Sequence, residues 1–198
     1  MMTKNAIVHP VWLRATHWIN ALAVFVMATS GLKIYNATAF LKFTFPGGVT
    51  LGGWLGGALQ WHFAAMWLLI INGMIYLIFN SVTNRLTTKF FPLSFKSFFS
   101  DINATLKGRL THADPWKYNT VQRFAYLLVM LDSMLLVLSG LVLWKSVQFP
   151  LLRALLGGYE GARLVHFAAM SAIVLFVMVH LVMVLLVPKT LLAMIRGR

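Results

Sequence analysis

The sequence contains no cysteine among its 198 residues. This absence excludes disulfide bonds, iron–sulfur clusters held by thiolates, and the C-x-x-C-H motif that attaches c-type haem. Any haem in this protein would therefore be bound non-covalently, through His or Met side chains.

Charged residues are also scarce. They make up 11% of the chain, against 60% hydrophobic residues, whereas a soluble domain usually carries about a quarter charged residues. Acidic residues are the scarcest, with 4 Asp and Glu against 17 Lys and Arg and a formal net charge of +13. Because the basic residues lie between long apolar runs, membrane topology explains their excess, and we expect no nucleic-acid binding.

Four apolar runs are long enough to cross the roughly 30 Å hydrocarbon core of a bilayer, which takes about 20 helical residues. They cover approximately residues 12–35, 61–80, 119–144 and 163–187. Only helices satisfy the backbone polar groups of such runs in lipid. The sequence therefore predicts an all-α integral membrane protein, in which residues 1–198 form a single four-transmembrane-helix bundle.

The distribution of Lys and Arg predicts the orientation of the bundle. With the N-terminus inside, twelve of the 17 basic residues face the cytoplasm and the other five face outward. The outward set is Lys33, Lys42, Lys145, Arg153 and Arg163. Short loops rich in Lys and Arg stay on the cytoplasmic side, so both termini are expected there. The first run lacks a small-residue cleavage site, and we interpret it as a retained span.

The cytoplasmic loop between the second and third spans contains a short amphipathic pattern. Its apolar stripe consists of Phe95, Phe98, Phe99, Ile102 and Leu106. Polar residues lie on the opposite face, among them Lys96 and Asp101. This pattern predicts an interfacial helix that lies on membrane lipid as a plain surface anchor.

An internal repeat links the two halves of the chain. The string HFAAM occurs at residues 62–66 and again at 166–170, an offset of 104, and a Phe-Pro pair precedes each copy at the same distance. A second echo, at an offset of 109, links the first and third spans. It consists of Arg14 with Arg123 and of Ser30-Gly31 with Ser139-Gly140. The first and second spans and the third and fourth spans are therefore predicted to be parallel repeats.

Four of the six histidines lie within the spans, where ionisable residues are rare and usually functional. His166 and His180 are 14 residues apart on one helix, which places them on nearly the same face and about 21 Å apart along the axis. His62 begins a span on the outer side, level with His166, and His17 begins one on the inner side, level with His180. Two pairs of facing imidazoles are what two axially ligated haem irons need.

Two alternatives to this pairing are open at the level of the sequence. The four histidines can be unrelated residues that bond to their neighbours within the membrane. A zinc site is the weaker alternative, because its ligands lie within a few ångström of one another and the helical rise separates these histidines.

Other residues near the histidine levels are candidates for supporting roles. Arg14, Arg123 and Arg163 lie at span starts, where a guanidinium can pair with a haem propionate; for the first two, marking the cytoplasmic side is the simpler explanation. Gly31, Gly140 and Gly73 lie at haem levels and can admit a flat macrocycle or simply allow close helix packing. Asp132 is an acid in mid-span, either part of a proton relay or a hydrogen-bonded structural acid.

These motifs resemble the bacterial cytochrome b561 family. The resemblance rests on Arg14-x-x-His17-Trp18, His62, Lys117-Tyr118-Asn119-x-x-Gln122-Arg123, Ser139-Gly140, His166 and His180. That family includes the cytochrome b subunits of nickel–iron hydrogenases, thiosulfate reductases and formate dehydrogenases. The resemblance implies two b haems, held by His17/His180 and His62/His166, that pass electrons between a quinone and a partner in the bacterial inner membrane. Asp132 departs from the family pattern, which would place an apolar residue there.

The resemblance leaves two functional classes. In the first, the chain is an electron-transfer subunit between ubiquinone or menaquinone and a periplasmic redox protein, such as a molybdopterin oxidoreductase or a c-type cytochrome. In the second, it is a stand-alone superoxide oxidase that reduces ubiquinone, and its outer basic residues steer a small anion. In the first class the quinone is expected near the inner haem, where polar residues gather. These are Asn20, Asn80, Lys117, Tyr118, Asn119 and Gln122.

Overall fold

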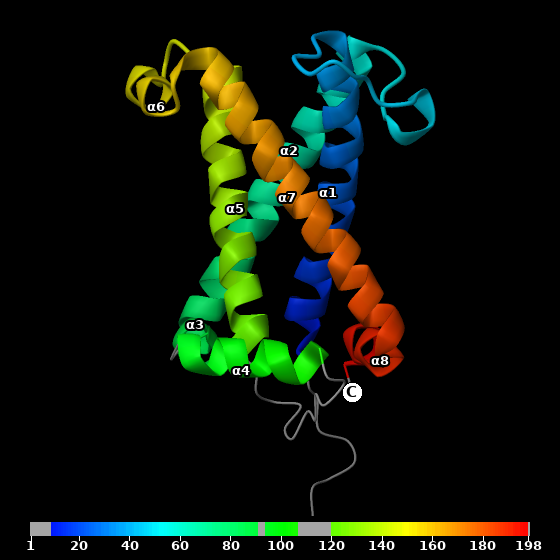
Figure 1. Cartoon of the computed structure of the whole chain (residues 1–198), viewed down its shortest axis with the longest axis vertical. Helices are drawn as coiled ribbons and strands as arrows, with labels where there is room; N and C mark the ends of the chain where they lie inside the picture. Colours follow the sequence, from blue (N-terminus) through cyan, green and yellow to red (C-terminus); the bar gives the residue numbers. More distant parts are fainter. Residues whose placement is uncertain (1–8, 91–93, 107–119, 198) are drawn as a thin grey trace, which may run out of the picture. The chain divides into compact units, whose positions relative to one another are not determined.

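The computed structural model describes residues 9–90, 94–106 and 120–197 of the chain. Within these ranges all regular structure is helical (Figure 1). The elements in chain order are α1 (Val11–Ala37), η1 (Gly47–Val49), α2 (Leu55–Val82), α3 (Arg85–Phe90), α4 (Phe95–Leu106), α5 (Thr120–Trp144), α6 (Pro150–Leu155), α7 (Gly158–Leu186) and α8 (Pro188–Arg196). The prediction of an all-α fold is confirmed.

Among the described residues, four helices are long and apolar enough to cross a membrane: α1, α2, α5 and α7. They match the four predicted spans, although α2 starts at Leu55 rather than near residue 61 and α7 starts at Gly158 rather than near residue 163. Glycine-rich sequence precedes both predicted starts and favours a loop. Tertiary packing overrides this propensity, because the first turns of α2 and α7 each bury an alanine completely, Ala58 and Ala162.

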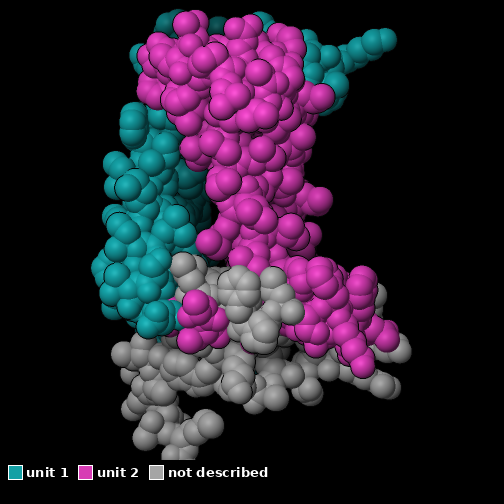
Figure 2. Space-filling view, turned by 90° about the vertical axis from the view of Figure 1, so that its left-hand side faces the viewer, with its two compact units in different colours: residues 1–84, 189–198 teal, residues 85–188 magenta. Residues whose placement is uncertain are grey.

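The chain divides into two compact units (Figure 2). Unit 1 comprises residues 1–84 and 189–198, and within it α1 packs along α2. Unit 2 comprises residues 85–188, and within it α5 packs along α7. Each unit thus contains one of the predicted helix pairs. The assignment of residues 1–198 to one domain stays a prediction.

Buried alanines occur at equivalent positions of the two helix pairs. In α2 these are Ala58 and Ala65, which are 0% and 5% exposed, and in α7 they are Ala162 and Ala169, which are 0% and 4% exposed. Residues seven positions apart lie on one helix face after two turns. Small side chains on that face let two backbones approach closely, which is how helices associate in lipid. The repeated HFAAM string, which contains Ala65 and Ala169, therefore encodes helix packing.

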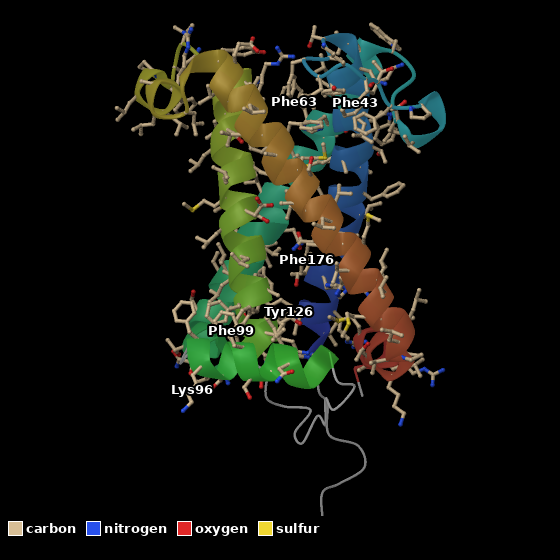
Figure 3. All side chains as sticks on the ribbon, viewed as in Figure 1. Phe43, Phe63, Lys96, Phe99, Tyr126 and Phe176 are labelled. Atoms are coloured by element: carbon tan, nitrogen blue, oxygen red, sulfur yellow. The ribbon has the colours of Figure 1, made fainter. Side chains whose placement is uncertain are left out.

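The predicted interfacial helix corresponds to α4 of unit 2. The Phe98 ring lies 4.7 Å from the Phe124 ring of α5, centre to centre. Asp101 Oδ2 accepts a hydrogen bond of 2.9 Å from the backbone N–H of Thr120, the first residue of α5. Asp101, expected on the polar face, thus satisfies one of the unpaired N–H groups at the start of a spanning helix. Lys96 is exposed and points away from α4 (Figure 3). The helix therefore docks onto α5 as well as presenting a surface, which the anchor interpretation did not include.

Candidate functional site

His62 of unit 1 lies on α2 and faces α1. Its Nδ1 atom is 3.1 Å from the Ser30 hydroxyl oxygen and 3.1 Å from the Met27 carbonyl oxygen. A carbonyl oxygen only accepts hydrogen bonds, so Nδ1 carries the hydrogen and donates it.

His166 of unit 2 lies on α7 and faces α5 in the same way. Its Nδ1 atom is 2.9 Å from the Ser139 hydroxyl oxygen. That hydroxyl donates its own hydrogen to the Leu135 carbonyl one turn earlier, at 2.7 Å. By analogy with His62, we assign the hydrogen to Nδ1 of His166, which then donates it to the serine oxygen. Ser30 is arranged alike, donating to the Val26 carbonyl at 2.6 Å.

These bonds indicate which nitrogen of each ring carries the hydrogen. A neutral imidazole with its hydrogen on Nδ1 keeps its lone pair on Nε2. Metal-binding histidines usually donate their other N–H to an oxygen in this manner, which fixes the tautomer and the ring orientation. His62 and His166 therefore fit axial ligation of a haem iron through Nε2. The internal repeat is confirmed in these side-chain contacts.

The glycine after each serine makes room for the histidine ring. A Cβ atom added at Gly31 would lie 3.5 Å from Cε1 of His62, and one added at Gly140 would lie 3.3 Å from Cε1 of His166. A side chain at Gly140 would crowd the His166 ring by a few tenths of an ångström, whereas one at Gly31 would be in ordinary contact with His62. The sequence left two roles open for these glycines: making room for a haem macrocycle or allowing close helix packing. Within each helix pair, the nearest neighbour of the glycine is the histidine ring.

His17 and His180 lie elsewhere along their helices. His17 is on α1, with its ring 5.4 Å from that of Trp18 in an edge-on arrangement. His180 is on α7, where the ring of Phe176, one turn earlier, stacks on it at 6.0 Å and 15°. The repeat does not extend to this level. At the offsets of 109 and 104, Tyr126 takes the place of His17 and Tyr76 that of His180.

A buried amide organises the helix backbone around His17. Asn72 of α2 is 3% exposed, and its Nδ2 donates to the Thr16 carbonyl at 2.8 Å and to Asn20 Oδ1 at 2.6 Å. These two partners flank His17 on α1, so one side chain ties both sides of the histidine to α2. Sequence reasoning missed Asn72. Its signal was an amide in the middle of an apolar span, where an unsatisfied polar group is expensive.

The predicted propionate partners have partners of their own. Arg14 Nη1 donates to the Ile195 carbonyl at 2.5 Å, and so closes the C-terminal end of α8 within unit 1. Arg163 Nη1 forms an ion pair with Glu160 at 2.8 Å. Arg123 lies in the first turn of α5, where it is partly exposed. Their role toward a haem stays a prediction, and Arg14 has a structural role that the sequence did not reveal.

The remaining polar candidates are placed as follows. Asn80 donates to the Tyr76 carbonyl of its own helix at 2.7 Å. Gln122 is partly exposed near the start of α5, whereas residues 117–119 lie outside the described ranges. Asp132 Oδ2 is buried and makes no hydrogen bond within the described part of the chain. The described residues of unit 2 thus do not supply the hydrogen-bond partner that this oxygen of a structural acid would need.

Comparison with known proteins gives a family match over nearly the whole chain. A family model described as prokaryotic cytochrome b561 matches residues 8–197. The chain is 61% identical, over 190 residues, to a putative protein-methionine-sulfoxide reductase subunit, YedZ1, of Azospira oryzae; the match covers 96% of each chain. It is 26% identical, over 193 residues, to a probable Ni/Fe-hydrogenase B-type cytochrome subunit of Cupriavidus necator, a match that covers 89% of this chain and 78% of the relative.

Proposed function

This chain belongs to the prokaryotic cytochrome b561 family as a membrane b-type cytochrome of electron transfer, and we propose that it holds two b haems that connect the quinone pool to a periplasmic redox partner. The observation that supports the proposal is the Ser–His contact, which recurs in both units and favours Nε2 over Nδ1 as the ligand atom of His62 and His166. Both relatives are named as subunits, which supports a subunit role over a stand-alone superoxide oxidase.

The proposed ligand pairs follow from the helix register. His62 and His166 occupy equivalent positions of the repeat and ligate the outer haem. The inner haem is ligated by His17 and His180, and the 14 residues between His166 and His180 separate the two levels by about 21 Å. A haem b supplies a one-electron couple between ferric and ferrous iron at each level.

The protein contributes orientation and exclusion of water. Ser30 and Ser139 hold the outer histidines, and Asn72 donates to the Thr16 carbonyl and to the Asn20 side chain, which flank His17. We assign Arg163 and Arg123 to haem propionates, because a guanidinium matches a carboxylate in a bidentate fork. Arg14 is assigned to α8, with a propionate as a second partner.

The partner is proposed to lie in the periplasm and the termini in the cytoplasm of a bacterial inner membrane. Twelve of the 17 basic residues favour this orientation. The outer basic residues, Lys145 and Arg153 among them, suit an acidic docking surface on the partner. Similarity to the subunit from Azospira oryzae supports a protein-methionine-sulfoxide reductase as the class of partner. Electrons would then flow from quinol through the chain to the reductase.

The proposed quinone site is near His17, where the Asn72–Asn20 hydrogen bond gives Asn20 a fixed orientation. Because Asn20 Oδ1 accepts from Asn72, the amide nitrogen of Asn20 points elsewhere and can donate to a quinone carbonyl. A membrane quinone also needs an apolar wall for its tail, and exposed Trp18 and Ile19 of α1 provide one beside Asn20.

Membrane vesicles of the two orientations test this function. Quinol is expected to reduce the b haem in both kinds of vesicle. A membrane-impermeant acceptor such as ferricyanide should reoxidise the haem rapidly in right-side-out vesicles and slowly in inverted ones, since the outer haem faces the periplasm. Faster reoxidation in inverted vesicles would reverse the orientation, and a haem that quinol never reduces would contradict the electron-transfer role.

A further inference from the structure

The hydroxyl groups that meet His62 and His166 belong to fully buried serines. Ser30 and Ser139 are each 0% exposed. Each hydroxyl donates to the carbonyl four residues earlier, at 2.6 Å for Ser30 and 2.7 Å for Ser139. Each hydroxyl oxygen is therefore directed at an imidazole as an acceptor, which is an unusual task for a serine that otherwise only bonds back to its own helix.

Other hydroxyl side chains in the described spans also donate to the carbonyl four residues earlier, although no histidine contact accompanies that bond. Thr29, next to Ser30, donates to the Phe25 carbonyl at 2.8 Å, and Ser171 of α7 donates to the Phe167 carbonyl at 2.8 Å. Ser171 is exposed. Back-bonding alone thus does not require burial, and what distinguishes Ser30 and Ser139 is the imidazole at 3.1 Å and 2.9 Å, respectively.

We propose that Ser30 and Ser139 are positioning residues that lower the midpoint potential of the outer haem. A hydrogen bond accepted from Nδ1–H increases the basicity of the imidazole at Nε2. A more basic axial ligand stabilises ferric over ferrous iron, and hydrogen bonding to the ligands is one of the ways in which a protein tunes haem potential. The inference rests on the proposed ligation of the outer haem by His62 and His166.

The two serines act on opposite ligands of one haem in this scheme, so their effects add. His62 keeps the Met27 carbonyl as a second acceptor when Ser30 is lost. Ser30→Ala should therefore preserve the tautomer of His62 while weakening its polarisation. This makes the potential, and not haem binding, the quantity that responds.

The experiment is a redox titration of purified holoprotein, followed in the haem absorbance bands, with electron paramagnetic resonance of the ferric low-spin haem. We expect Ser30→Ala and Ser139→Ala each to raise the outer-haem midpoint potential. The double variant should shift its ferric-to-ferrous equilibrium by about tenfold, which is about 59 mV for one electron. The inner haem should keep its potential. Ser139→Thr retains the hydroxyl acceptor, so its outer-haem midpoint potential should equal that of the wild type.

Matched controls separate tuning from packing. Thr29→Ala and Ser171→Ala remove the same kind of back-bond and should leave both potentials and the resonance spectrum unchanged. If Ser139→Ala fails to hold haem, Ser139→Cys fills the space with a weak acceptor, and its potential is expected to rise instead. Unchanged potentials in variants that retain both haems would overturn the inference alone. A wild-type protein whose outer haem is not ligated by two histidines would overturn the proposed function.

Discussion

Replacing His62 or His166 with Ala is expected to remove one haem, and replacing His17 or His180 with Ala is expected to remove the other. Each haem iron loses one of its two axial ligands in these variants, and a haem b has no covalent bond to the protein that would retain it. The measurement is the reduced-minus-oxidised spectrum of each purified variant, together with a redox titration that identifies the surviving haem.

The chain provides a control for this experiment in His9, which lies before α1 and outside the spanning helices. His9→Ala should retain both haems. The two variants of the outer pair should match one another, as should the two of the inner pair. If His62→Ala and His17→Ala lost the same haem, the assignment of histidines by depth would be wrong.

Replacing Asn20 with Leu is expected to slow quinol-driven haem reduction about tenfold, while reduction by dithionite proceeds as before. The loss corresponds to one hydrogen bond between the Asn20 amide and a quinone carbonyl, about 1.4 kcal/mol. Leu has the branched shape of Asn but removes the acceptor of the Asn72–Asn20 hydrogen bond, and the hydrogen bond from Asn72 to the Thr16 carbonyl remains to join α2 to α1. Stopped-flow absorbance with a soluble quinol analogue measures the rate.

Thr29→Ala is the matched control for this variant, because Thr29 lies on the same helix near the level of His62. Its rate should equal that of the wild type. An unchanged rate in Asn20→Leu, together with a large loss in Arg163→Ala, would move the quinone to the other side of the membrane.

The fold was largely predictable because a bilayer imposes a strong constraint on sequence. Each spanning helix had to be an uninterrupted apolar run, and all four were found. Helices α2 and α7 begin before the predicted spans because a hydropathy run marks only the length that crosses the bilayer, and a helix can continue beyond it.

The candidate site was predictable where the repeat was visible. The two HFAAM strings and the two Ser-Gly pairs indicated equivalent histidines, and both were found in contact with the equivalent serine. The tautomer of each ring was not predictable, because it depends on where the serine hydrogen is donated. Asn72 and Asp101 were missed for a related reason. Each bonds to a backbone group, the Thr16 carbonyl for Asn72 and the Thr120 N–H for Asp101, and such a partner leaves no pattern of residue types in the sequence.

The central claim is that the chain holds two haems between four histidines, and the ratio of haem to protein tests it most directly. The pyridine haemochrome of the purified wild-type protein, set against protein measured by amino-acid analysis, should give a b-type spectrum and two haems per chain. One haem per chain, or none, would contradict the pairing of His62 with His166 and of His17 with His180.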